Sequence, residues 1–269
     1  MKRILLLTDF SDTARHAVMY ALKMFESSNM DYYLLNAYEL EFSGTPYVTQ
    51  VKEEWATESL KGLKSELSII HHRYPQARVE LLSVFGTLID AVKHEVTKHT
   101  YDLLVLGCKG ETALENFLLG SRAYDVIKHI PTPVFLVPRH AKFKYPEKIV
   151  FATDLHDFPS DKTIEPVRDM VHMFHSPLVF VNVLDEDVAD RVESEDLIAK
   201  HFPGVNVSFN FVEDDTVSDG INKFVEENDA QIITLVRHQM GRFDRFFHPS
   251  VTRQMVLHPE HPMLILHDV

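Results

Sequence analysis

Residues able to bind a phosphate group concentrate in one short, glycine-rich stretch of this chain. Glycine is scarce, with nine residues in 269, yet three of the nine fall within fourteen positions. The stretch reads Gly107-Cys108-Lys109-Gly110, then nine further residues, then Gly120-Ser121-Arg122. Because glycine has no side chain, the backbone can turn tightly and approach a ligand closely at these positions. The spacing therefore indicates a loop that could hold an anion against backbone N–H groups.

The flanking pattern places this loop between a strand and a helix. An apolar run at residues 103–106 predicts a strand that ends at Gly107, and Gly120-Ser121 opens a predicted helix. A helix N-terminus presents unpaired N–H groups and the positive end of the helix dipole, which together favour an anion. Ser121 could cap this helix or give its hydroxyl group to a phosphate oxygen.

Two cations beside the glycines strengthen the phosphate interpretation. Lys109 and Arg122 could neutralise negative charge on a ligand that the loop holds. A simpler interpretation stays open, because glycines after strands often only permit turns and Ser121 could be only a helix cap. Cys108, inside the loop, could be an oxidation-sensitive thiol, but we expect it to be a small residue that fills a tight turn.

Alternating strands and helices must position this loop. Stripes of apolar residues three and four apart predict helices between short apolar runs, and these runs predict strands at residues 4–7, 32–37, 79–84, 103–106 and 134–137. The alternation favours a parallel sheet with right-handed crossovers and helices on both faces. Such sheets bind ligands beyond the carboxyl ends of their strands, where the strand order reverses. Asp9 and Gly107 both follow predicted strands, so we expect them to contribute to one site.

The whole pattern occurs twice. Residues 2–10, an apolar run with Thr8-Asp9 near its end, return 145 positions later as residues 147–155. Towards the end of each copy the offset is 129, so the second copy is shorter by 16 residues, lost mainly from its middle. We therefore expect one domain at 1–138 and a second at 147–269, with 139–146 as the linker.

The motif Gly-x2-Gly-x9-Gly-Ser, followed by a helix and Pro-Thr-Pro-Val-Phe-Leu-Val, resembles the nucleotide-binding signature of the universal stress protein family. The opening Thr8-Asp9-Phe10-Ser11 is similar to the end of that family's first strand. The resemblance covers the whole chain as two copies. It implies an α/β fold of two tandem five-stranded parallel-sheet domains of Rossmann-like type, packed as a pseudo-dimer through their fifth strands.

The resemblance also implies a ligand and a set of site residues. The first copy would bind ATP, which Mg²⁺ could accompany. Asp9 would meet the adenosine, and Thr8 beside it is also expected to belong to the cofactor site. Ala37 would lie against adenine, and Gly86 matches a glycine that the family has after its third strand. The phosphates would be held by Gly107, Gly110, Gly120 and Ser121, with Lys109 and Arg122 as nearby cations. Two departures bear on affinity: Lys109 replaces a common arginine or histidine, and Arg122 replaces a common small residue.

The second copy has lost the glycine motif. At the offset of 129, the three glycines become Val236, Gln239 and Pro249, and only the serine keeps its type, as Ser250. Valine and glutamine do not readily adopt glycine conformations, and proline has no N–H group to donate. We expect one ATP per chain, bound in the first domain, and a second domain that is structural or binds a partner.

Composition narrows the possible environment and partners. The formal net charge is −13, which repels nucleic acid and anionic lipid surfaces. A single cysteine cannot form an internal disulfide, and no segment approaches the roughly 20 apolar residues that span a bilayer. We therefore expect a cytoplasmic protein. His258 and His261 are three residues apart, but Pro259 and Pro262 interrupt any helix between them, so we expect no metal site.

Three functions are compatible with these features. The first is a stress-response protein whose bound ATP sets the shape or the protein partners of the first domain. The second is an interaction scaffold without nucleotide. The third is a slow ATP hydrolase, for which the sequence offers neither a recognisable general base nor a Walker lysine, so no catalytic residue is expected. Whether two chains form a homodimer is left open.

Overall fold

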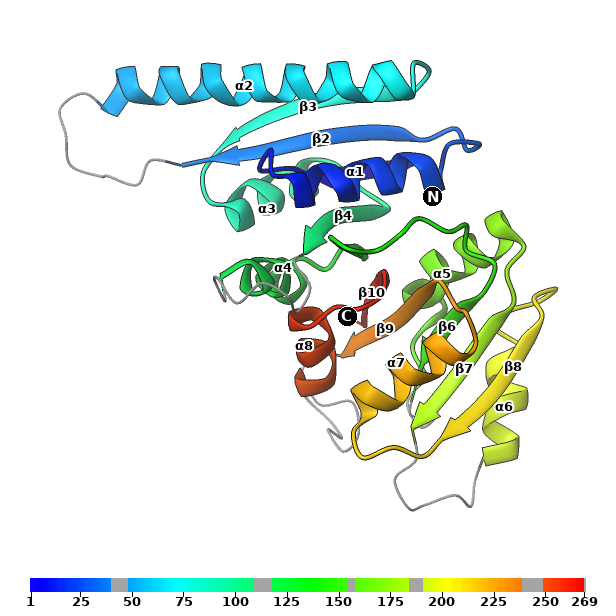
Figure 1. Cartoon of the computed structure of the whole chain (residues 1–269). Helices are drawn as coiled ribbons and strands as arrows, with labels where there is room; N and C mark the ends of the chain where they lie inside the picture. Colours follow the sequence, from blue (N-terminus) through cyan, green and yellow to red (C-terminus); the bar gives the residue numbers. More distant parts are fainter. Residues whose placement is uncertain (40–47, 109–117, 154–157, 184–190, 239–248, 269) are drawn as a thin grey trace.

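The structure is a computed structural model of the chain, and it describes residues 1–39, 48–108, 118–153, 158–183, 191–238 and 249–268. Strands and helices alternate through both halves (Figure 1). The first half contains β1 Arg3–Leu7, α1 Asp12–Met24, β2 Asp31–Tyr38, α2 Val48–Arg73, β3 Arg78–Phe85, α3 Leu88–Lys98, β4 Leu103–Cys108, α4 Leu118–His129 and β5 Val134–Pro138. The second half contains β6 Ile149–Ala152, α5 Asp161–Phe174, β7 Leu178–Val183, α6 Arg191–Ala199, β8 Val207–Val212, α7 Val217–Glu227, β9 Ile232–His238, α8 Pro249–Leu257 and β10 Met263–Asp268.

Across the described ranges, ten strands form one continuous sheet in the order β3-β2-β1-β4-β5-β10-β9-β6-β7-β8. The five strands of each half are parallel to one another. At the centre β5 and β10 run antiparallel, with Leu136 opposite Met263 and Val134 opposite Ile265. The predicted α/β fold of two parallel-sheet halves is confirmed. The halves join edge to edge through their fifth strands, which merges the two predicted sheets into one.

Hydrophobic cores cover both faces of this sheet along its whole width. Successive residues of a strand point to opposite faces, so Ile4 and Leu6 pack into one core and Leu5 and Leu7 into the other. Helices α1, α2, α5 and α6 supply the first core, and α3, α4, α7 and α8 supply the second. Each core thus includes helices from both halves, and the two halves share their packing as well as their sheet.

In the described part of the chain, four helices begin at a capping side chain, and equivalent helices of the two halves use the same residue type. Ser11 accepts a hydrogen bond from the third residue of α1, and Ser160 does the same for α5. Thr87 and Thr216, which are 129 residues apart, cap α3 and α7 in the same way. Each cap satisfies one of the N–H groups that a helix start leaves unpaired. The duplicated pattern therefore includes the signals that start the helices.

Further contacts hold the halves together beyond the central strand pair. Helices α4 and α8 lie side by side across the junction (Figure 1), and the guanidinium of Arg253 lies 5.9 Å from the ring centre of Tyr124. Phe143, between β5 and β6, packs edge-on against Tyr20 of α1 with ring centres 4.9 Å apart. In the part of the chain that is described, every helix is too short or too polar to cross a bilayer.

Candidate functional site

A cavity of about 350 Å³ opens at the carboxyl edge of the first half. The ends of β1, β2 and β4 form its floor, and the first turns of α1 and α3 and the second turn of α4 form its walls. It is lined by Leu7, Thr8, Asp9, Ser11, Thr13, Ala14, Ala37, Glu39, Gly86, Thr87, Leu88, Ile89, Leu106, Gly107, Arg122, Ala123 and Asp125. Strands β1 and β4 are neighbours here although β2 lies on the other side of β1, so the cavity marks the point where strand order reverses.

Five of the nine residues predicted for the site line this cavity: Thr8, Asp9, Ala37, Gly107 and Arg122. Gly86, the glycine expected after the third strand, lines it too. The other four are Lys109, Gly110, Gly120 and Ser121.

Those four residues divide into two pairs. Lys109 and Gly110 lie outside the described residues. Gly120 and Ser121 belong to α4, which begins two residues earlier than predicted, at Leu118. Ser121 therefore lies in the first turn of α4, and the expectation that it caps the helix is wrong. Gly120 is the third residue of α4, and an N–H group at that position has no partner within the helix.

The turn after β1 is held in an unusual backbone conformation. Phe10 has a φ of 65°, which is uncommon for a residue other than glycine. Its N–H donates to Oγ1 of Thr8 over 3.0 Å, and the N–H of Ser11 donates to Oδ1 of Asp9 over 3.0 Å. The ring of Phe10 lies against Gly62 of α2, where a Cβ would come within 2.5 Å of it. These contacts point the chain from β1 into α1 and leave Asp9 exposed at the cavity.

A buried polar chain ties three strands together beneath the cavity. The amide nitrogen of Asn36 donates to the carbonyl oxygen of Thr8 over 2.8 Å, and Ser59 of α2 donates to the amide oxygen of Asn36 over 2.8 Å. Ser83 of β3 in turn donates to Ser59. In the second half Asn182 donates to the carbonyl oxygen of Thr153 over 2.9 Å, which repeats the Asn36 contact. The sequence repeat pairs Asn36 with Asn182, but only the structure shows that these side chains support the ends of β1 and β6.

At Gly107 the protein itself leaves no room for a side chain. A Cβ at this position would come within 2.4 Å of the carbonyl oxygen of Thr13, because α1 crosses directly over β4. The equivalent residue in the second half, Val236, is buried in the core, and the helix α5 packs against β10. The group that approaches Gly107 closely is therefore the first turn of α1, and the predicted close approach of a ligand stays a prediction.

Sequence reasoning missed five polar residues of the cavity: Ser11, Thr13, Glu39, Thr87 and Asp125. For two of these residues, Asp125 and Glu39, the spacing in the sequence could have indicated the position. Asp125 follows Arg122 by three residues in α4, which places the two side chains on one helix face. Glu39 follows Ala37 by two residues in an extended segment, which places both on one side of the chain. With Asp9, the cavity has three carboxylates and one guanidinium group among its lining residues.

Cys108 is buried beside the cavity and does not line it. Burial raises the pKa of its thiol, since the surrounding core disfavours the thiolate. A thiol that remains protonated is a poor nucleophile. The expected role of Cys108 as a packing residue agrees with this position.

Comparisons with known proteins agree on one family. The family model described as "Universal stress protein family" matches residues 1–138 and 186–267. A universal stress protein of Methanocaldococcus jannaschii is 28% identical over 148 residues, which is 52% of this chain and 84% of that protein. A universal stress protein E homolog of Haemophilus influenzae is 22% identical over 163 residues, 57% of this chain and 52% of that protein.

The fold also matches a solved structure along nearly its whole length. The crystal structure of a universal stress protein from Archaeoglobus fulgidus covers 99% of this chain, and this chain covers 98% of it. The TM-score is 0.74 at 18% sequence identity, which supports the two-half fold. The family model, the relatives and this fold lead to one conclusion: the chain belongs to the universal stress protein family.

Proposed function

We propose that the first half binds one molecule of ATP in the cavity at its carboxyl edge, and that the bound nucleotide regulates the shape or partners of a cytoplasmic stress-response protein. The observation that carries this proposal is the convergence of Asp9, Ala37, Gly107 and Arg122 on one cavity at the point where strand order reverses. A volume of about 350 Å³ lies within the range of small-ligand sites. Membership of the family supports the same proposal.

The two sides of the cavity suit the two ends of a nucleotide. Apolar side chains of Ala37, Leu88 and Ile89 offer a surface for an adenine ring, and the exposed carboxylate of Asp9 can accept hydrogen bonds from ribose hydroxyl groups. On the other side Arg122 presents five N–H donors in the second turn of α4, near the helix N-terminus, where the helix dipole favours phosphate. In this proposal Lys109, Gly110, Gly120 and Ser121 complete the phosphate contacts, and Thr8 supports Asp9.

The carboxylates in the cavity bear on the form in which the nucleotide binds. Asp9, Glu39 and Asp125 would repel a bare polyphosphate. A divalent ion would be attracted both to these carboxylates and to the phosphates. We therefore include Mg²⁺ in the proposal, bound together with ATP. A titration with ATP in the presence and absence of Mg²⁺ tests this point, and tighter binding without the ion would contradict it.

Nucleotide binding is tested first on the protein as purified. The full-length protein is denatured, the supernatant is analysed for nucleotides by mass spectrometry, and ATP affinity is then measured by calorimetry on stripped protein. We expect adenine nucleotide in the wild type and its loss in Gly120→Val, which adds a side chain to the first turn of α4. Equal nucleotide content in the two proteins would contradict binding through the first turn of α4. No nucleotide in either protein, with no measurable affinity, would favour a scaffold without nucleotide.

A matched pair of charge variants separates a phosphate contact from a general electrostatic effect. Arg122→Gln and Lys128→Gln each remove one exposed positive charge from α4, but only Arg122 lines the cavity. Loss of a charge-assisted hydrogen bond is worth about 1.5–3 kcal/mol, so Arg122→Gln should weaken ATP binding by about tenfold or more. Lys128→Gln should bind as the wild type does. Equal effects of the two variants would remove Arg122 from the site.

Stoichiometry tests the asymmetry between the halves. The second half carries Val236 in place of Gly107, and its helix α8 begins at Pro249, which cannot donate an N–H group. We expect one ATP per chain at saturation. Two equivalents per chain would contradict the proposal that the second half has lost nucleotide binding.

A further inference from the structure

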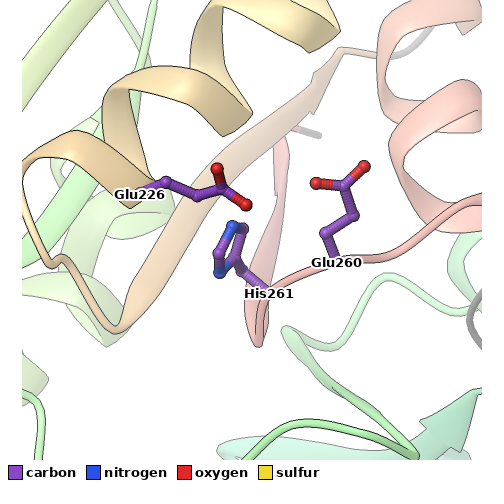
Figure 2. Close-up of side chains that lie close together, drawn as sticks. All are labelled: Glu226, Glu260 and His261. Atoms are coloured by element: carbon purple, nitrogen blue, oxygen red, sulfur yellow. The ribbon is translucent and has the colours of Figure 1, made fainter.

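Three ligand-type side chains converge near the junction of the two halves, away from the cavity described above. Glu226 lies in the last turn of α7, and Glu260 and His261 lie between α8 and β10. One ligand atom from each of the three lies within 4.8 Å of the others. In Figure 2 the imidazole of His261 turns one nitrogen toward the carboxylate of Glu226, and the carboxylate of Glu260 faces the same space. The three side chains therefore surround one small volume from two segments of the chain.

The imidazole of His261 is available as a ligand. Its Nε2 atom is buried and has no hydrogen-bond partner within the described ranges. Such an atom is unusual, since most buried polar side-chain atoms in proteins are hydrogen-bonded. Burial also lowers the pKa of His261, although the nearby Glu226 carboxylate opposes this effect. A neutral imidazole keeps a lone pair on one nitrogen, which is the form that binds metals.

The donor set and the spacing favour a divalent transition metal. One imidazole nitrogen and two carboxylate oxygens are ligands that Zn²⁺ binds at about 2.0–2.2 Å, so neighbouring ligand atoms in a tetrahedral site lie about 3.3 Å apart. The present separation of up to 4.8 Å would close through rotation of the glutamate side chains, of which Glu226 is exposed. The net charge of −13 gives the protein a field that attracts cations.

We propose that Glu226, Glu260 and His261 bind one divalent transition-metal ion of the zinc type, with water completing its coordination. The ion would tie α7 to the segment that leads into β10. That segment is also bound to the connection between the halves, because Nε2 of His140 donates to the backbone carbonyl oxygen of Glu260 over 3.1 Å. A bound ion would therefore stabilise the junction where β10 meets β5. The sequence expectation of no metal site rested on His258 and His261, whereas this group uses a glutamate 35 positions earlier.

A matched pair of variants on α7 tests the site in the full-length protein. Glu226→Gln and Glu227→Gln change the same charge at adjacent exposed positions, but only Glu226 belongs to the group. Protein stripped with EDTA is titrated with Zn²⁺ against a chromophoric chelator, without nucleotide. We expect one equivalent to bind the wild type and Glu227→Gln with equal affinity. Glu226→Gln should bind at least about tenfold more weakly, because even outer partners of metal ligands contribute that much.

Thermal unfolding supplies a second readout that surface binding would not reproduce. Zn²⁺ should raise the melting temperature of the wild type and Glu227→Gln, and should leave that of Glu226→Gln unchanged. The sixteen histidines of the chain can bind Zn²⁺ weakly at the surface, so equal affinity and equal shifts in all three proteins would mean adventitious binding and would overturn the proposal. Glu260→Gln repeats the test from the other segment, and circular dichroism of each metal-free variant checks its fold. If both variants fold and both keep wild-type affinity, the proposal is wrong.

Discussion

Nε2 of His267 donates a hydrogen bond of 2.7 Å to the backbone carbonyl oxygen of Ile127, which lies 140 residues earlier in the chain. His267 belongs to β10 in the second half, and Ile127 lies near the end of α4 in the first half. The last four carbonyl groups of a helix have no partner within it, so His267 supplies a donor that α4 lacks. The first turns of the same helix carry Arg122 and Asp125 into the candidate site. One wall of that site is therefore held in place by the other half of the protein.

Replacing His267 should lower the free energy of unfolding, and the loss should be larger when the new side chain has no N–H donor. His267→Phe leaves the buried carbonyl oxygen of Ile127 without this donor, and an unsatisfied buried acceptor costs about 1–3 kcal/mol. His267→Gln keeps an N–H donor and should lose less. Urea unfolding followed by circular dichroism gives the free energy of unfolding for each variant. Equal losses in the two variants would mean that side-chain volume, and not the hydrogen bond, matters at this position.

The same histidine predicts how stability changes with pH. Burial lowers the pKa of His267 below its usual 6.5, Arg237 lowers it further, and the hydrogen bond to Ile127 opposes them. The unfolded chain therefore takes up this proton more readily than the folded chain. The free energy of unfolding should be highest above pH 6.5 and should fall as the pH drops below it, by up to about 1.4 kcal/mol per pH unit for one such group.

Comparison with a variant isolates the contribution of His267. Burial lowers the pKa of His16 as well, so the wild-type curve contains more than one group. Urea midpoints measured between pH 7.5 and pH 5 should decline less steeply in His267→Phe than in the wild type. Parallel curves would show that His267 carries no part of the pH dependence.

Gly107→Ala should destabilise the protein even without nucleotide. The added Cβ would come within 2.4 Å of the carbonyl oxygen of Thr13, so α1 would have to shift away from β4. Overpacking of this kind costs about 1–3 kcal/mol. The melting temperature of nucleotide-free protein measures this cost. If Gly107→Ala melts like the wild type and only ligand affinity changes, the glycine serves the ligand and the contact with α1 is tolerant.

Cys108 should react with thiol reagents only when the chain unfolds. Its side chain is buried at 1% exposure, and burial raises the pKa of its thiol. Labelling by a chromogenic disulfide reagent at pH 8 should be at least about a hundredfold slower in native protein than in urea, because the thiolate is the reactive form. Adding ATP should leave the native rate unchanged or lower it. Rapid labelling of native protein would contradict the buried position of this side chain.

The first half expressed alone should form a dimer. Residues 1–146 would leave β5 without β10, so Val134, Phe135 and Leu136 would form an unpaired apolar edge. Such edges pair with another strand when one is available. Light scattering after gel filtration should give twice the mass of residues 1–146. A monomer at micromolar concentration would mean that the edge is covered in some other way.

Much of the fold could be predicted because each element has its own local pattern. The helix expected between the strands at 32–37 and 79–84 is α2, Val48–Arg73, and the strand expected at 134–137 is β5, Val134–Pro138. Element ends were less certain, because the backbone can continue a turn beyond its apolar stripe. Thus α4 begins at Leu118, before the glycine and serine that were expected to open it.

The site could be predicted only in part. Asp9 and Gly107 were expected to meet because strand ends in a parallel sheet share one edge, and both line the cavity. The polar chain from Asn36 through Ser59 to Ser83 was not expected, since it joins two strands and a helix whose spacing in the sequence carries no signal. The sequence also did not show why position 107 is a glycine, because the group that excludes a side chain there, the carbonyl of Thr13, belongs to a different element, α1.

The antiparallel pairing of β5 with β10 has a consequence for how this protein could change over evolutionary time. The junction uses the edges of these two strands, whereas the cavity uses the carboxyl ends of β1, β2 and β4. After a duplication that fused two copies, substitutions at the strand ends of one copy would leave the shared edge intact. Selection could therefore relax on the second pocket without separating the halves, and the altered copy would persist as a fused subunit that supports α4 of the other.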